Sequence, residues 1–164
     1  MRHAFLAAAA SLIFAAAPAL AGEQYMSEGY AVSGYDVVAY HDIEQADVGT
    51  PQPKAVRGSP AFQTEYNGAK WLFSSAANRD AFLAQPEKYA PAFDGHCAFG
   101  VARGGKVPGN PHLWRIVDGK LYLNITRRVA GFWEKDIPGN ISTAGSNWTM
   151  LEAAPASQRT VPPS

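Results

Sequence analysis

The stretch FQTEYNGAKWLF, residues 62–73, decides the fold because it places a turn signal between two β-forming runs. Asn67-Gly68 is the turn signal, and aromatic side chains recur on either side of it. Both residues of a two-residue hairpin turn need positive φ, which Asn and Gly adopt most easily. The stretch therefore predicts a β-hairpin with strands at 62–66 and 70–73.

A helix is expected directly after this hairpin, over residues 76–85. Ser74 or Ser75 can cap its start, because a serine hydroxyl accepts a hydrogen bond from a free backbone N–H. Pro86 is expected to end it, because proline cannot continue a helix. The side chains expected to face inward are Ala77, Asn78, Ala81 and Phe82.

A second segment repeats this order of hairpin, cap, helix and proline. Residues 114–117 and 120–124 flank Asp118-Gly119, which is another hairpin turn signal. A helix is expected to follow over residues 127–136. Thr126 is expected to cap this helix, and Pro138 is expected to end it. Its apolar side chains are Val129, Phe132 and Trp133.

Superposing the two turn signals places Phe82 on Trp133 and Trp71 on Tyr122. The two segments are either a duplication or two uses of one common motif. In both cases the sequence predicts an α+β fold, built of antiparallel hairpins that are each followed by a packed helix. The side chains expected to form its core are Trp71, Phe73, Phe82, Trp114, Tyr122, Phe132 and Trp133.

Composition indicates what the other segments do. The pattern at 36–41 predicts a short leading strand, and residues 22–35 are expected to be irregular. Residues 93–113 are rich in Gly and Pro and predict loops, where binding residues often gather. We expect a single domain at 22–151 and a disordered tail at 152–164.

The first 21 residues have the pattern of a cleavable export signal. Arg2 gives a positive start, residues 4–17 are apolar apart from Ser11, and residues 19–21 match a small-x-small cleavage site. The apolar run is shorter than the roughly 18 residues that a membrane-spanning helix needs. We therefore expect cleavage after Ala21, a periplasmic or secreted mature protein, and no transmembrane segment within it.

Charge and cysteine content narrow the range of functions. Lys plus Arg and Asp plus Glu number 14 each, which is not the basic composition typical of nucleic-acid-binding proteins. The sequence contains one cysteine, so no disulfide can form within the chain. Cys97 is therefore a buried structural residue, a metal ligand, a reactive thiol or a site of pairing with another molecule.

Three motifs around the first hairpin give a family resemblance. EYNG at 65–68, WLFSS at 71–75 and RDAFLAQPEKY at 79–89 resemble the YHS-domain family, with residues 35–40 as its leading strand. The whole chain is similar to a longer exported version of that family. The resemblance implies a small domain linked to a metal, with copper as the first candidate.

In the family members with a metal rationale, two cysteines supply it. By the resemblance, the corresponding positions here hold Ala39 and Ser74, and neither side chain provides a thiolate. The resemblance therefore supports the fold and places no soft-metal site at those two positions.

Cysteine and histidine side chains elsewhere offer a candidate metal site. Thiolate and imidazole ligands suit copper(I) or zinc. A tight turn at Gly95 would let adjacent histidine and cysteine residues face one ion. The candidate ligands are His96, Cys97 and His112 from the loop region, with His41 from the leading strand.

Other interpretations stay open beside the metal site. Cys97 is either a buried small apolar residue or a nucleophile activated by His96 or His112, with Asp94 or Asn110 to orient the histidine. Alternatively, some of the aromatic side chains line a pocket for a small molecule. The sequence thus predicts a binding or accessory protein whose partner is a metal ion or a small molecule. The alternatives are Cys-dependent catalysis and a purely structural module.

Overall fold

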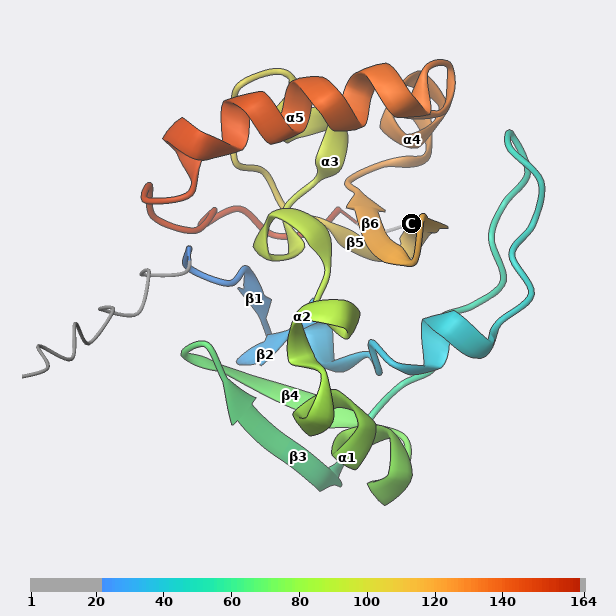
Figure 1. The fold of residues 1–164 in the computed structure, drawn as a ribbon, viewed down its shortest axis with the longest axis vertical. Helices are drawn as coiled ribbons and strands as arrows, with labels where there is room; N and C mark the ends of the chain where they lie inside the picture. Colours follow the sequence, from blue (N-terminus) through green and yellow to red (C-terminus); the bar gives the residue numbers. More distant parts are fainter. Residues whose placement is uncertain (1–21, 163–164) are drawn as a thin grey trace, which may run out of the picture.

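The structure is a computed structural model that describes residues 22–162 (Figure 1). The expected export signal at 1–21 lies outside the described residues. Within the described part, three two-stranded antiparallel sheets combine with short helices, which confirms the α+β class. Figure 1 shows the first hairpin-helix unit near one end of the molecule and the second unit, with the C-terminal helices, toward the other.

The first hairpin pairs β3 (Ser59–Tyr66) with β4 (Ala69–Phe73) around the expected turn. Asn67 and Gly68 have φ values of 51° and 72°, as a two-residue turn of this kind requires. The predicted hairpin is therefore confirmed.

Helix α1 (Ala76–Ala84) follows this hairpin, and the Ser75 hydroxyl caps it by accepting a hydrogen bond at 3.1 Å. Phe82 is fully buried, as expected. Ala77 was also expected to face inward, but it is exposed. The buried residue of α1 is Phe82, which lies near the C-terminal end of the helix, whereas Ala77 lies in its first turn. Pro86 ends α1 and also begins the short helix α2 (Pro86–Tyr89), since proline is favoured in a first turn.

The second hairpin pairs β5 (Asn110–Val117) with β6 (Lys120–Asn124). Asp118 and Gly119 form its turn with φ values of 49° and 75°. The second hairpin prediction is also confirmed, although β5 begins four residues earlier than the sequence pattern indicated.

Helix α4 (Arg127–Glu134) follows the second hairpin, and Thr126 caps it as expected. Trp133 is buried, with 1% of its surface exposed. Phe132 is 39% exposed, which corrects its expected place in the core. Neighbouring residues of a helix point about 100° apart, so a short helix that turns Trp133 onto the hairpin turns Phe132 toward solvent.

Helix α5 (Ile137–Leu151) begins where the sequence predicted a helix to stop. Pro138 lies in its first turn, where the backbone N–H groups have no partner within the helix, so a proline loses no hydrogen bond. The Asp136 side chain caps the helix by accepting a backbone hydrogen bond at 3.0 Å. Pro138 therefore starts a helix instead of ending one. Among residues 22–162, no helix, α5 included, has the length and apolarity of a membrane span.

Residues 36–41, expected to be a strand, form a turn that leads into a 3-10 helix at Ala39–Asp42. The cause is Asp36, whose buried carboxylate accepts hydrogen bonds from the N–H groups of Val38 at 2.9 Å and Ala39 at 3.2 Å. These bonds bend the backbone and remove both N–H groups from any strand ladder.

Two segments expected to be irregular contain short regular elements. A small hairpin, β1 (Met26–Ser27) with β2 (Tyr30–Ala31), lies within residues 22–35. Between the two larger hairpins, a 3-10 turn at Ala92–Gly95 precedes helix α3 (Ala98–Ala102). Helix α5 packs against α3.

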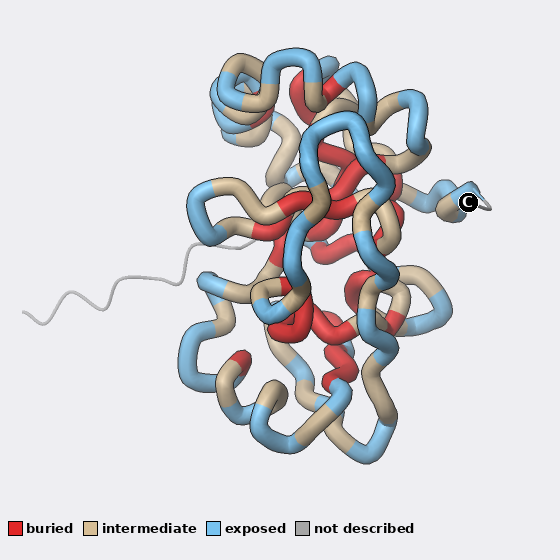
Figure 2. Tube along the Cα trace, turned by 90° about the vertical axis from the view of Figure 1, so that its right-hand side faces the viewer, coloured by how far each residue is buried: buried red, intermediate tan, exposed pale blue. Residues whose placement is uncertain are grey.

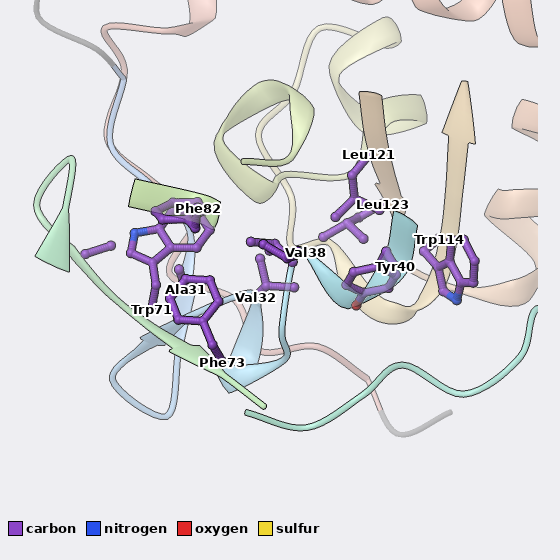
Figure 3. Packing of buried hydrophobic residues seen from close by; sticks show 12 residues of the cluster. Ala31, Val32, Val38, Tyr40, Trp71, Phe73, Phe82, Trp114, Leu121 and Leu123 are labelled. Atoms are coloured by element: carbon purple, nitrogen blue, oxygen red, sulfur yellow. The ribbon is translucent and has the colours of Figure 1, made fainter. Parts of the chain in front are cut away.

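One apolar cluster joins the two hairpin units, as Figure 3 shows. Trp71 and Phe82 meet at one end with ring centroids 4.9 Å apart, and Tyr40 and Trp114 meet at the other end at 5.1 Å. Val38 lies between these two pairs. Figure 2 shows the buried segments running through the middle of the molecule. The two units therefore share one core.

Residues 152–162 follow α5 without regular structure, yet they are held against the rest of the chain. Ala156 is buried, and its N–H donates to Glu23 at 2.9 Å. The Tyr25 hydroxyl donates to the Arg159 carbonyl at 3.0 Å. Within the tail expected to be disordered at 152–164, backbone polar groups thus find partners on the N-terminal segment.

Candidate functional site

Cys97 is fully buried at the start of α3. Its sulfur accepts a hydrogen bond from the Gly100 N–H at 3.4 Å and lies 3.5 Å from the Asn124 side-chain oxygen. Burial raises the pKa of the Cys97 thiol, which disfavours the thiolate that a nucleophile or a metal ligand requires. In this structure Cys97 therefore packs and caps a helix.

His96 is also fully buried, and both of its ring nitrogens are engaged. Nδ1 lies 2.9 Å from the Phe93 carbonyl oxygen, and the Ser157 N–H donates to Nε2 at 3.1 Å. These partners assign the ring proton to Nδ1. Burial lowers the pKa of His96 to about 4, so the ring is neutral at pH 7. With both nitrogens occupied, His96 offers no free lone pair to a metal ion.

His112, on β5, faces Tyr35. Its Nε2 lies 3.0 Å from the Tyr35 hydroxyl, and the two rings meet edge to face with centroids 4.8 Å apart. Burial lowers the pKa of His112, and the positive charges of Lys54 and Arg57 lower it further. This imidazole therefore contacts a tyrosine and lies in the field of two cationic side chains.

His41 packs edge to face on Tyr89, with ring centroids 5.2 Å apart. Its Nε2 is buried without a hydrogen-bond partner among residues 22–162. Burial, followed by the charge of Lys88, lowers the pKa of His41. A neutral ring is the form that such an environment favours.

The four predicted metal ligands therefore do not form one ligand set. His96 and Cys97 are neighbours whose polar atoms are engaged by the chain itself, whereas His112 and His41 pack on different tyrosines. Across the described residues, no group of three or more His, Cys, Asp or Glu side chains is arranged to hold a metal ion. These four side chains do not fit the copper or zinc site that their residue types predicted.

The arrangement needed for Cys-dependent catalysis is not formed either. No hydrogen bond joins Cys97 to His96 or His112 within residues 22–162. Asn110, considered as an orienting group, uses its side-chain oxygen to accept the His112 backbone N–H at 2.9 Å. It fixes the backbone of β5 and does not orient an imidazole.

His112 instead lines a groove that we call the basic groove, defined by Tyr35, Lys54, Arg57, His112 and Arg127. Its volume is about 640 Å³. None of the described residues that line it is acidic. The groove lies between β5, the start of α4 and the long loop after Asp42, which extends from one side of the molecule in Figure 1.

The positive charges of the basic groove are only partly compensated. Arg57 makes an exposed ion pair with Glu28 at 3.0 Å and stacks over the Tyr35 ring. Lys54 and Arg127 make no ion pair within the described part of the chain. Arg127 is the first residue of α4, so the positive end of that helix adds to the same field.

A smaller hollow of about 180 Å³ adjoins the basic groove and shares His112 and Arg127 with it. Arg115 and Glu134 line this hollow and form a nearly buried ion pair at 2.7 Å. Arg115 also donates to the backbone carbonyls of Ala46 and Asp47 at 3.1 and 3.3 Å. These bonds attach the long loop to the second hairpin unit and so fix one wall of the groove.

The charged residues of this groove could not be singled out from the sequence, because they come from separate parts of the chain. One signal was nevertheless present in the sequence. Arg127 and Arg128 stand in the first turn of a helix, where positive charge opposes the helix dipole. Basic residues at such a position are a reason to look for a role other than helix stability.

A comparison with known protein families finds a match that starts in the long loop and ends just after α2. Residues 52–93 match the family model of the YHS domain. The resemblance predicted from the sequence is confirmed over this segment, which contains the first hairpin, α1 and α2. The match includes Ser74 and leaves out residues 35–40, where Ala39 lies. Neither the curated proteins nor the solved structures give a match to the chain.

Ala39 and Ser74, which stand at the cysteine positions of the resemblance, meet at the Asp36 carboxylate. Ser74 donates to Oδ2 through its N–H at 2.8 Å and its hydroxyl at 2.7 Å, and Ala39 donates to Oδ1. A hydrogen-bonded carboxylate therefore occupies this junction. It joins the YHS domain to the turn that precedes it.

Proposed function

We propose that the protein is an exported accessory protein that binds a small anionic molecule in its basic groove. The observation that carries this proposal is the convergence of Lys54, Arg57 and Arg127 on a groove with no acidic residue among its described lining. A groove of about 640 Å³ suits a molecule of metabolite size. Carboxylate and phosphate groups are the anions that guanidinium and ammonium groups bind best.

The pair of Tyr35 and His112 gives the groove groups that can orient such a ligand. The Tyr35 hydroxyl and His112 Nε2 share a hydrogen bond at 3.0 Å, and the imidazole keeps its second ring nitrogen, Nδ1, for a ligand. An anion bound beside His112 would offset the charges of Lys54 and Arg57. Binding is therefore expected to raise the pKa of His112.

The YHS domain supports an accessory role in general terms, and the surroundings of Cys97 favour binding over thiol chemistry. The buried thiol has a raised pKa and no histidine partner in residues 22–162. The basic groove is accessible, by contrast, and its lysine and arginine side chains are available to a ligand.

Calorimetric titration at low ionic strength tests the proposed binding, with phosphate, citrate and benzoate as probes. We expect at least one probe to bind the wild type and to bind Arg127→Gln at least ten times more weakly. Arg128→Gln is the matched control, because Arg128 is the next residue on α4 and does not line the groove. Equal affinity in the two variants, or no binding of any probe, would refute the groove as an anion site.

A second measurement follows the His112 ring by NMR during the same titrations. Its pKa is expected to rise when the anion binds, while that of the buried His96 stays low. An anion that binds without changing the His112 titration binds elsewhere.

The exported state is tested separately by cell fractionation and N-terminal sequencing. Residues 1–21 motivate the expectation of a mature chain that begins at Gly22. Recovery of the protein from the exported fraction with Met1 intact would contradict cleavage, and recovery from the cytosol alone would contradict export.

A further inference from the structure

Asp94 has a buried carboxylate oxygen, Oδ2, that lacks a hydrogen-bond partner among residues 22–162. An unpaired buried carboxylate is unfavourable, because the charge has lost its water without gaining a donor. Burial accordingly raises the pKa of Asp94. The surroundings of Asp94 therefore lack a donor.

The backbone holds Asp94 in place despite an uncommon conformation. Phe93 and Asp94 have φ values of 55° and 50°, a region that non-glycine residues adopt rarely. The Tyr25 N–H donates to the Asp94 carbonyl at 2.8 Å, which fixes the turn against the N-terminal segment. The side chain is thereby positioned beside the first described residues of the chain.

Gly22 is buried directly against this carboxylate. A Cβ added to Gly22 would overlap Asp94 Oδ2 and would lie 3.0 Å from the Glu152 backbone oxygen. Glycine is therefore the residue that fits. The backbone nitrogen of Gly22 is bonded to the same Cα and therefore lies near these two acceptors.

The neighbouring lysines do not supply the missing donor. The charge of Lys106 lowers the pKa of Asp94 through space. The Lys106 Nζ, however, donates its hydrogen bonds to two backbone carbonyls after α5, at 3.1 and 2.6 Å. The charge of Lys120 also lowers the pKa of Asp94 through space, but the Lys120 Nζ donates to a backbone carbonyl of α2 at 2.7 Å. Glu152 adds a further negative charge near Asp94. The site therefore favours a further cation that can donate to Asp94.

We propose that the partner of Asp94 is the α-ammonium group of Gly22, which the proposed cleavage after Ala21 creates. A signal peptidase would add one water molecule across the peptide bond between Ala21 and Gly22. The products are a carboxylate on Ala21 and an amine on Gly22, which takes up a proton at neutral pH. A neutral amide with one donor thus becomes a cation with three donors beside an unpaired carboxylate.

This ion pair joins three segments of the fold. Gly22 begins the N-terminal segment, Asp94 lies in the turn before α3, and Glu152 follows α5. The inference rests on the proposed cleavage and is independent of the basic groove. Its consequence is that removal of the export signal completes the native contacts, so that the processed protein is more stable than its precursor.

The test compares processed protein, purified after export and shown by sequencing to begin at Gly22, with the uncleaved full chain made in the cytosol. Each form is prepared as wild type and as Asp94→Asn. Asparagine keeps the size of the side chain and accepts positive φ readily, so this variant removes the charge with little effect on the turn. Asp80→Asn is the control, because Asp80 is exposed and pairs with Arg79 on α1.

We expect processing to raise Tm by several degrees in the wild type and in Asp80→Asn, and to leave Tm unchanged in Asp94→Asn. The α-amino pKa, followed by the pH dependence of amine labelling, should lie above about 9 in the wild type, against about 7.7 to 8.0 for an unpaired terminus. It should return to the ordinary range in Asp94→Asn. An ordinary α-amino pKa in the processed wild type, an equal effect of processing in Asp94→Asn, or a mature chain that begins at another residue would each overturn the inference.

Discussion

At the scale of single residues, Asp36 organises the junction between the leading turn and the YHS domain. One carboxylate oxygen accepts from the N–H groups of Val38 and Ala39, and the other accepts from Ser74 and the Asn78 side chain. The residue is fully buried, so these donors replace the water that the charge would otherwise bind.

Replacing Asp36 with asparagine should therefore destabilise the protein strongly. The change removes the charge and turns one acceptor oxygen into an NH₂ group that faces other donors. We expect a loss of about 3 kcal/mol in the free energy of unfolding, measured by urea denaturation at pH 7. Asp80→Asn, at a side chain that is 63% exposed, should change it by less than about 0.5 kcal/mol. Similar losses in both variants would contradict the role given to Asp36.

A second test at this scale concerns Cys97. It addresses the prediction that any bound metal uses Cys97 together with His96 or His112. The thiol is buried and caps α3, and both nitrogens of His96 are engaged. We therefore expect wild type and Cys97→Ser to bind zinc and copper(I) equally weakly in calorimetric titrations, with circular dichroism to confirm folding. A large loss of affinity in Cys97→Ser, with Ser74→Ala unchanged, would instead establish the metal site.

At the scale of elements, each hairpin-helix unit depends on one buried aromatic side chain. Truncating Phe82 or Trp133 to alanine should cost about 3 to 5 kcal/mol in the free energy of unfolding, because each leaves a cavity in a packed core. The chain provides matched controls at adjacent positions, Leu83 at 52% and Phe132 at 39% exposure. Replacing Leu83 or Phe132 with alanine should lower the free energy of unfolding much less. Urea denaturation of the four variants measures this difference. Equal costs within either adjacent pair would refute the packing described for that helix.

The hairpins could be predicted from sequence because their determinants are local. Asn67-Gly68 and Asp118-Gly119 specify a turn wherever they occur between strand-forming residues. Residues 36–41 were predicted wrongly because the Asp36 carboxylate also binds donors of Ser74 and of Asn78 on α1, which are distant in sequence. Helix α5 was missed because it contains Pro138 and two glycines and buries little more than Ala144.

At the scale of the whole molecule, His96 connects the centre of the chain to the residues after α5. The Ser157 N–H donates to the neutral ring, and protonation of Nε2 would remove that acceptor. The folded-state pKa of about 4 lies below the ordinary 6.5, so between these values the unfolded chain binds more protons. The contribution of His96 to stability is therefore present above pH 6.5 and is lost as the pH falls toward 4.

Urea denaturation from pH 7.5 to 4 should reveal this loss. The difference between the two pKa values corresponds to about 3 kcal/mol. His96→Gln should lack that part of the pH dependence, and subtracting its curve from the wild-type curve removes the effects of the other titrating groups, including the opposite effect of Asp94. Parallel curves for the two proteins would contradict the buried neutral state of His96.

The candidate site could be predicted only in part, for reasons that also belong to this scale. His112 was singled out from the sequence, although as a metal ligand. Its partners in the basic groove come from the segment before the YHS domain, the long loop and the start of α4, and tertiary packing alone brings them together. Cys97 and His96 drew attention by their residue type, but their burial depends on contacts with β6 and the residues after α5.

The pairing of the two ends of the described chain also governs when folding can finish. Glu23 and Tyr25 bind partners 133 and 134 residues away, at Ala156 and Arg159. A polypeptide is synthesised from its N-terminus, so Ala156 and Arg159 emerge from the ribosome long after Glu23 and Tyr25. Closing loops of this length is slow, and contacts of such separation form late. The N-terminal contacts of the nascent chain therefore stay open until residues 156 and 159 have been made, a delay that would favour the export proposed above.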